Sequence, residues 1–164
     1  MATISRKGFA QVEPNHLSGI VTGQILAQLP AAAEMGDVIE NGRFAKYDYA
    51  KNEVNLTGAG EWMLIYNEVK LYDERKQGLK DFAMVKENYT EGVMVPRLIS
   101  TVLGDIYTTN AFKEEIELVE GDIVSVGAEG WLVKEEIADV PNFQVAKVYT
   151  MPDGQPGVKL MRVK

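Results

Sequence analysis

The chain has 164 residues, of which 46% are hydrophobic and 25% are charged, and this composition is typical of a soluble globular protein and excludes disorder as its overall state. Its 24 acidic and 17 basic residues give a formal net charge of -7, which is unfavourable for nucleic acid binding because that needs clustered Lys and Arg. The absence of cysteine excludes disulfides, thiolate metal sites and a cysteine nucleophile. No apolar run reaches the length of a membrane-spanning helix, so we expect neither a nucleic acid nor a membrane as partner.

Residues 1–19 are predicted to form an extended N-terminal arm, because they show no helix or strand period. The arm carries the apolar Ile4, Phe9 and Val12 and the basic Arg6 and Lys7. Ordering a residue costs roughly 1–2 kcal/mol of backbone entropy, and a buried apolar side chain returns about 1.5–3 kcal/mol. Three such side chains cannot order the arm, so we expect it to contact another subunit through these five partner-binding residues. Deletion of residues 2–13 is then expected to leave the body of the protein folded.

The body, residues 20–164, is predicted to begin with a strand over residues 20–30 that ends at Pro30. Residues 31–35 predict one helical turn that stops at Gly36. Short apolar or alternating segments then predict strands at residues 44–49, 53–56, 62–66, 82–85, 93–102 and 106–109. Residues 73–81 predict a charged loop, although a helix over residues 73–88 is the alternative.

The C-terminal third predicts strands at residues 116–118, 123–126, 131–133, 143–150 and 158–163. Residues 152–157 contain two prolines and two glycines and predict an antiparallel hairpin between the last two strands. Short strands with Gly-rich turns and no sustained helical period indicate an all-β or mainly β fold, a single compact antiparallel β-barrel or sandwich. The predicted core consists of Leu64, Ile65, Ile116, Leu118, Ile123, Trp131, Val133, Val145 and Leu160.

The sequence predicts no catalytic residue, no cofactor and no metal site. His16 is the only histidine, so neither a Ser-His-Asp arrangement nor an ordinary zinc site is expected. Asp105 and Asp122 each follow a glycine, where Asp usually accepts hydrogen bonds from its own turn. The glycines of residues 58–60 precede a strand, whereas a phosphate-binding loop precedes a helix.

Three segments carry a resemblance to a known family: residues 38–49 (VIENGRFAKYDY), residues 60–73 (GEWMLIYNEVKLYD) and residues 104–110 (GDIYTTN). Residues 38 to about 133 resemble a family of small structural proteins of tailed bacteriophages that are found with the capsid. The resemblance implies a β-rich head decoration or cement protein, which is made in the host cytoplasm and lies on the outside of the capsid. It implies the phage major capsid protein as partner, a homo-oligomer with a trimer favoured, and no catalytic residue.

Two other classes of function remain open at this point. A carbohydrate- or receptor-binding module of a phage tail or baseplate would use Trp62, Tyr66 or Trp131 as stacking surfaces. A small hydrolase would need two carboxyl groups that face each other in a concave pocket.

Overall fold

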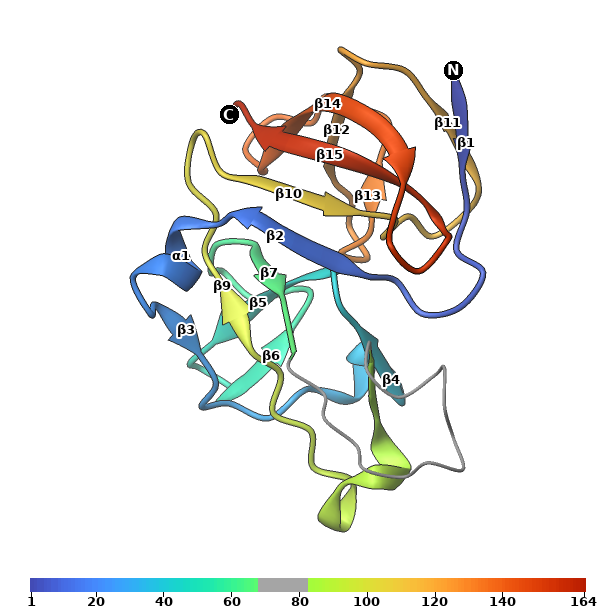
Figure 1. Cartoon of the computed structure of the whole chain (residues 1–164). Helices are drawn as coiled ribbons and strands as arrows, with labels where there is room; N and C mark the ends of the chain where they lie inside the picture. The colour runs from blue at the N-terminus through green and yellow to red at the C-terminus, as the bar shows by residue number, and fades with distance from the viewer. Residues whose placement is uncertain (68–82) are drawn as a thin grey trace.

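Two antiparallel sheets form the framework of the computed structural model, which describes residues 1–67 and 83–164 (Figure 1). The larger sheet has the strand order β13 (Leu132–Val133), β12 (Ile123–Val126), β14 (Asn142–Thr150), β15 (Pro156–Arg162), β10 (Ile106–Thr109) and β2 (Val12–His16). The second sheet has the order β3 (Ile25–Leu26), β9 (Leu98–Ile99), β7 (Met63–Ile65), β5 (Phe44–Asp48) and β6 (Glu53–Asn55). The fold is mainly β, as predicted, and the described sheets are open, so it is sandwich-like rather than a closed barrel.

Two small sheets and a few helical turns complete the described residues. β1 (Ala2–Ile4) pairs with β11 (Ile116–Leu118), and β4 (Val38–Glu40) pairs with β8 (Ala83–Val85). The helical segments are α1 (Ser18–Val21), η1 (Ala33–Met35), η3 (Lys86–Asn88) and η4 (Thr90–Gly92). The predicted charged loop at residues 73–81 and most of its helical alternative lie outside the described residues.

The predicted C-terminal hairpin is confirmed. β14 and β15 pair antiparallel from Phe143 opposite Arg162 to Thr150 opposite Pro156, with a bulge between Val145 and Lys147. The helical turn predicted for residues 31–35 is also confirmed as η1, and it ends at Gly36, whose φ of 85° suits a glycine.

The strand predicted for residues 20–30 is wrong over its first part. Ser18–Val21 form α1 instead, and only Ile25–Leu26 pair in a sheet. The side chain of Asp105, far along the chain, accepts hydrogen bonds from the Ser18 backbone N–H at 3.1 Å and its hydroxyl at 2.7 Å. This long-range contact holds the start of the helical turn and overrides the β-branched pattern of Ile20 and Val21.

The core divides into two apolar clusters, one under the six-stranded sheet and one beside the five-stranded sheet. The predicted core residues Leu64, Ile65, Leu118, Val145 and Leu160 are buried, whereas Ile116, Ile123, Trp131 and Val133 are half-buried. Phe143 lies at the centre of the first cluster, with its ring 5.8 Å from that of Phe44 and 5.5 Å from that of Tyr107.

Candidate functional site

The three segments that carry the family resemblance meet at an interior seam between the two main sheets. Asn41 donates to the backbone oxygen of Asn67 at 3.0 Å, and Asn67 N–H donates to the side chain of Asn41 at 2.8 Å. Gly42 N–H donates to the Ile65 oxygen at 2.9 Å, and a Cβ at Gly42 would lie 2.8 Å from Thr109 Oγ1. The motif residues at this seam therefore act in packing and turn formation.

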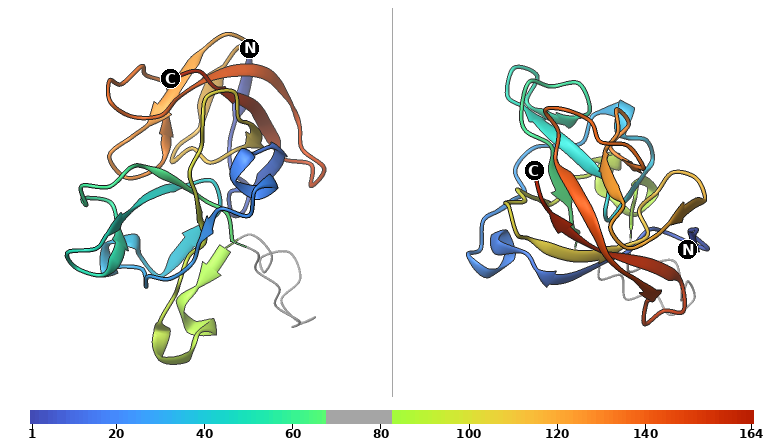
Figure 2. Two further views of the ribbon diagram at one scale, coloured as in Figure 1. Left: turned by 90° about the vertical axis from the view of Figure 1, so that its left-hand side faces the viewer. Right: turned by 90° about the horizontal axis from the view of Figure 1, so that it is seen from above.

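The N-terminal arm packs on its own chain on either side of Lys7. β1 pairs with β11, with Ile4 opposite Ile116, and β2 pairs with β10, with Val12 opposite Thr109 (Figure 2). Ile4 is 0% exposed within the single chain, and Val12 packs against the same apolar cluster. The expectation that another subunit buries Ile4 is therefore wrong.

Side chains of the body also bind the backbone of the arm between these strands. Lys7 N–H donates to Gln155 at 2.8 Å, Ala10 N–H to Glu40 at 3.1 Å and Gln11 N–H to Asn110 at 2.9 Å. The expectation of a subunit contact counts only the three apolar side chains as stabilisation from within the chain. It leaves out hydrogen bonds between the body and the backbone of the arm. These partners, together with the strand pairing of β1 and β2, supply the missing stabilisation.

Arg6 is the most heavily bonded of the five predicted partner-binding residues. Its guanidinium donates to the backbone oxygens of Phe112 at 2.8 Å and Lys113 at 3.2 Å, and it forms an ion pair with Glu40. It also lies 4.3 Å from the ring centroid of Trp131. Lys7 has an exposed side chain and Phe9 is half-buried, so the five residues do not form one surface.

A second guanidinium stacks on Trp131, which also contacts Arg6. Arg43 lies 4.9 Å from the ring centroid and donates to the backbone oxygens of Met35 at 3.2 Å and Glu129 at 3.0 Å. Burial lowers the pKa of Arg43, while the negative charges of Glu40 and Glu129 oppose that shift. Trp131 is thus occupied by two cations of its own chain, which is unfavourable for a sugar-stacking role.

The other two aromatic residues proposed for sugar stacking do not form a platform either. Trp62 is 8% exposed, and the ammonium of Lys46 lies 4.6 Å from its ring centroid. Tyr66 follows β7 and is half-buried. The aromatic residues therefore give the carbohydrate-binding alternative no support.

The hollows on the described surface include two of similar size. The first, of about 380 Å³, is lined by Trp62, Lys46, Glu61, Asp139 and Arg162 among others, and its Arg162 lies 3.6 Å from Glu61. The second, of about 390 Å³, is lined by Ser5, Arg6, Gly8, Phe112, Lys113, Glu114 and Glu115. One cation in each hollow already has a partner in the fold, since Arg6 pairs with Glu40 and Arg162 lies beside Glu61.

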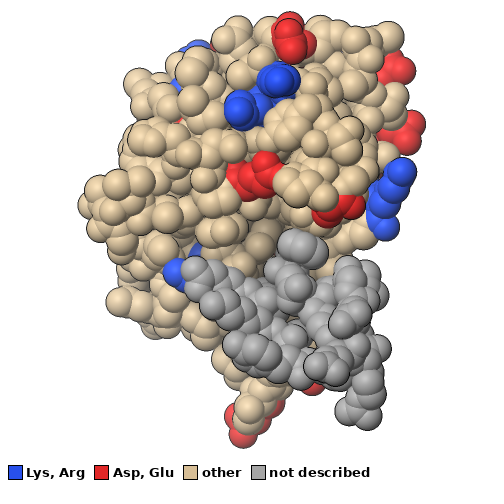
Figure 3. Space-filling model, viewed as in Figure 1, with Lys and Arg blue, Asp and Glu red and all other residues tan. Residues whose placement is uncertain are grey.

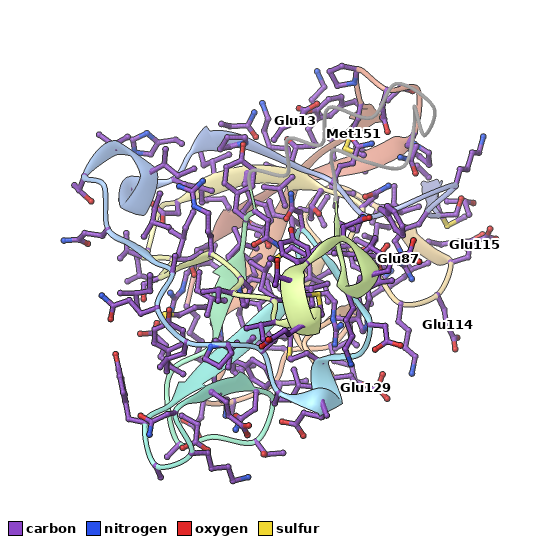
Figure 4. The ribbon with its side chains drawn as sticks, turned by 90° about the horizontal axis from the view of Figure 1, so that it is seen from below. Glu13, Glu87, Glu114, Glu115, Glu129 and Met151 are labelled. Atoms are coloured by element: carbon purple, nitrogen blue, oxygen red, sulfur yellow. The ribbon has the colours of Figure 1, made fainter. Side chains whose placement is uncertain are left out.

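The carboxylates that the sequence singles out, Asp105 and Asp122, serve their own turns. Asp105 and Asp122 accept N–H donors of their own turns at 2.9 Å each, as predicted. Hydrogen bonds and nearby Lys side chains lower the pKa of Asp122 and Glu129, the opposite of what a general acid requires. Figure 4 shows Glu114, Glu115 and Glu129 spread along one rim of the molecule.

Within residues 1–67 and 83–164, no group of three or more His, Asp or Glu residues has the geometry to hold a metal ion. No helix in that part of the chain is long and apolar enough to cross a membrane. Comparisons with protein-family models, with curated proteins and with solved structures find no match.

Proposed function

We propose that the chain is a virion structural protein, a capsid decoration or cement protein that binds the outside of a phage head. It would stabilise the contacts between capsid subunits, with the major capsid protein as its partner. We also propose that it acts as a homo-oligomer, with a trimer favoured, and that it is not an enzyme.

The observation that supports this proposal most is the use of the resembling segments. Residues 41–43 bond to residues 65–67, and Gly42 packs against Thr109, so residues from three distant parts of the sequence meet at the seam between the sheets. A likeness concentrated in packing residues fits a family whose members share a scaffold. A likeness between enzymes would instead include residues placed for catalysis.

The N-terminal arm, which packs on its own chain, gives further support to the proposal. A protein that reinforces a shell needs a body that resists unfolding, and the arm is held by strand pairing on both sides and by Arg6 in between. The free energy that orders the arm comes from contacts within one chain. The outer surface therefore remains available for a partner.

The proposal is tested on purified, DNA-free heads of the phage that encodes the chain. We expect quantitative mass spectrometry to find the chain in a fixed ratio to the capsid subunit. Adding the purified chain to heads made without it should give saturable binding and a higher temperature of shell disruption. Absence from heads, or fractionation with tails, would contradict the proposal.

A further inference from the structure

One end of the outer face of the six-stranded sheet carries partly exposed apolar side chains in register. Ile106 on β10 lies opposite Met161 on β15, and both are half-buried. Their neighbours Tyr107 and Leu160 also face each other and are 0% exposed. Because successive side chains alternate across a strand, Ile106 and Met161 point away from the core.

The turn before β10 extends this apolar surface. Gly104 N–H donates to the Arg162 oxygen at 2.9 Å, which brings the turn to the end of β15. Leu103 in this turn is 70% exposed, and Val163, two residues beyond Met161, is 39% exposed. Asp105 holds the turn by accepting Val102 N–H at 2.9 Å and both donors of Ser18, so the position of Leu103 is fixed before any partner binds.

Two lysines lie beside this apolar end on the same outer face. Lys159 is two residues before Met161, about 7 Å along β15, and Lys147 lies directly opposite it on β14. Figure 3 shows Lys or Arg atoms on the upper part of this face, with Asp or Glu atoms a short way below them. Like charges directly opposite on paired strands are destabilising. Neither lysine forms an ion pair with a carboxylate of residues 1–67 or 83–164, although Lys159 lies 6.0 Å from the ring centroid of Tyr149.

We propose that this surface, the β10–β15 patch, docks on a protein surface that is apolar and has carboxylates at its rim. The patch consists of Leu103, Ile106, Met161, Val163, Lys147 and Lys159. An acidic rim would offset the repulsion between the two lysines, neither of which forms an ion pair within the described residues; the nearest acidic group in their cross-strand row, Glu13, lies beyond Thr108 and accepts from Tyr149. Under the proposed function, on which this inference rests, that surface belongs to the capsid shell.

Charge complementarity favours such a partner over a symmetric pair of copies. A two-fold interface whose axis passes near Lys147 and Lys159 would bring the lysines of the two copies together. That arrangement adds repulsion. The chain as a whole carries a net charge of -7, and the two lysines make this part of its surface locally basic. An acidic partner would therefore bind here in preference to the rest of the surface.

The experiment measures binding of purified variants to heads made without the chain. K147E/K159E reverses the basic pair, and K51E/K86E is its control because it makes the same charge change at two exposed lysines outside the patch. L103D places a charge in the apolar part, and V93D is its control because Val93 is 50% exposed and lies elsewhere. All six positions are at least partly exposed, so circular dichroism and the melting midpoint should show folded proteins.

We expect the half-saturating concentration to rise on the order of tenfold or more for K147E/K159E and for L103D, and to stay near wild type for both controls. Wild-type binding should also weaken as salt rises, and K147E/K159E should show less of this dependence. If the patch variants bind as the controls do, the patch inference is overturned while the proposed function stands. If the wild-type chain does not bind heads at all, both are overturned.

Sedimentation of the free proteins tests whether a second copy of the chain covers the patch. If the wild-type chain is an oligomer and both patch variants are monomers, a second copy covers the patch, and the docking inference is wrong. If the oligomeric state is the same in all five proteins, the loss of binding reports the contact with the head itself.

Discussion

Replacement of Arg6 by alanine tests whether the N-terminal arm belongs to the body of the protein. Arg6 binds the backbone oxygens of Phe112 and Lys113, pairs with Glu40 and stacks on Trp131. If the arm is a separate element that a partner orders, R6A leaves the free energy of unfolding unchanged. If the arm is part of the body, the loss is large.

The expected magnitude follows from the burial of the partners. A hydrogen bond to a charged group contributes roughly 1.5–3 kcal/mol, and removing one partner of a buried ion pair costs roughly 3–5 kcal/mol. The side chain of Glu40 is 9% exposed, whereas that of Arg6 is 21% exposed, so water partly replaces the lost guanidinium. We therefore expect R6A to lower the free energy of unfolding by about 2–4 kcal/mol, out of the roughly 5–15 kcal/mol that is typical of a domain.

Urea unfolding followed by tryptophan fluorescence measures this change, with K113A as control. Lys113 pairs with Glu129 at 2.5 Å, but both side chains are more than half exposed, so its loss should cost under about 0.5 kcal/mol. E40Q alone and R6A/E40Q complete a double-mutant cycle, in which the double variant should lose about 1–3 kcal/mol less than the sum of the single losses. A loss for R6A no larger than that for K113A would refute the reasoning.

Three further predictions concern the core, a pair of glycine turns and pH. The buried hydroxyl of Tyr107 has no hydrogen-bond partner in the described residues, so Y107F should raise the free energy of unfolding by about 1 kcal/mol; a loss would show that the hydroxyl is bound. Gly130 has a φ of 78°, and a Cβ there would lie 2.1 Å from the Phe44 oxygen, so G130A should cost more than about 3 kcal/mol. Gly154 has a similar φ of 86° but open space around it, so G154A should cost only about 1–2 kcal/mol; equal losses would contradict the packing argument. The pKa values of Asp122 and Glu129 are lowered in the folded state, so stability should be lost as the pH falls below about 4, and D122N should reduce that dependence in acid titrations.

The parts of the fold that sequence could predict are those that local patterns specify. The hairpin of β14 and β15 follows from the turn residues between them, and the burial of Leu118 and Val145 follows from alternation along short strands. The mainly β class follows from the same signals. None of these depends on a partner far away in the sequence.

The misplaced elements depend on such distant partners. α1 forms where a strand is predicted because Asp105, 87 residues away, binds Ser18. The arm is fixed by Glu40 and Asn110, which no spacing rule connects to residues 6–11. The candidate patch shows the same limit, since Lys147 and Lys159 face each other only because a bulge shifts the register of β14.

One strand of the arm, β2, belongs to the same sheet as the β10–β15 patch, yet the contacts that hold Arg6 lie outside the patch. β2 of the arm forms the edge next to β10, and His16 lies opposite Ile106 of the patch. The contacts of Arg6 are Glu40, Phe112, Lys113 and Trp131, none of which belongs to the patch. The effects of substitutions at sites without shared partners on the free energy of unfolding are additive. A variant that keeps about 3 kcal/mol of stability is still about 99% folded. If the proposed patch is the docking surface, a folded R6A protein should therefore bind heads as the wild type does, because the contacts of Arg6 affect stability and not the patch.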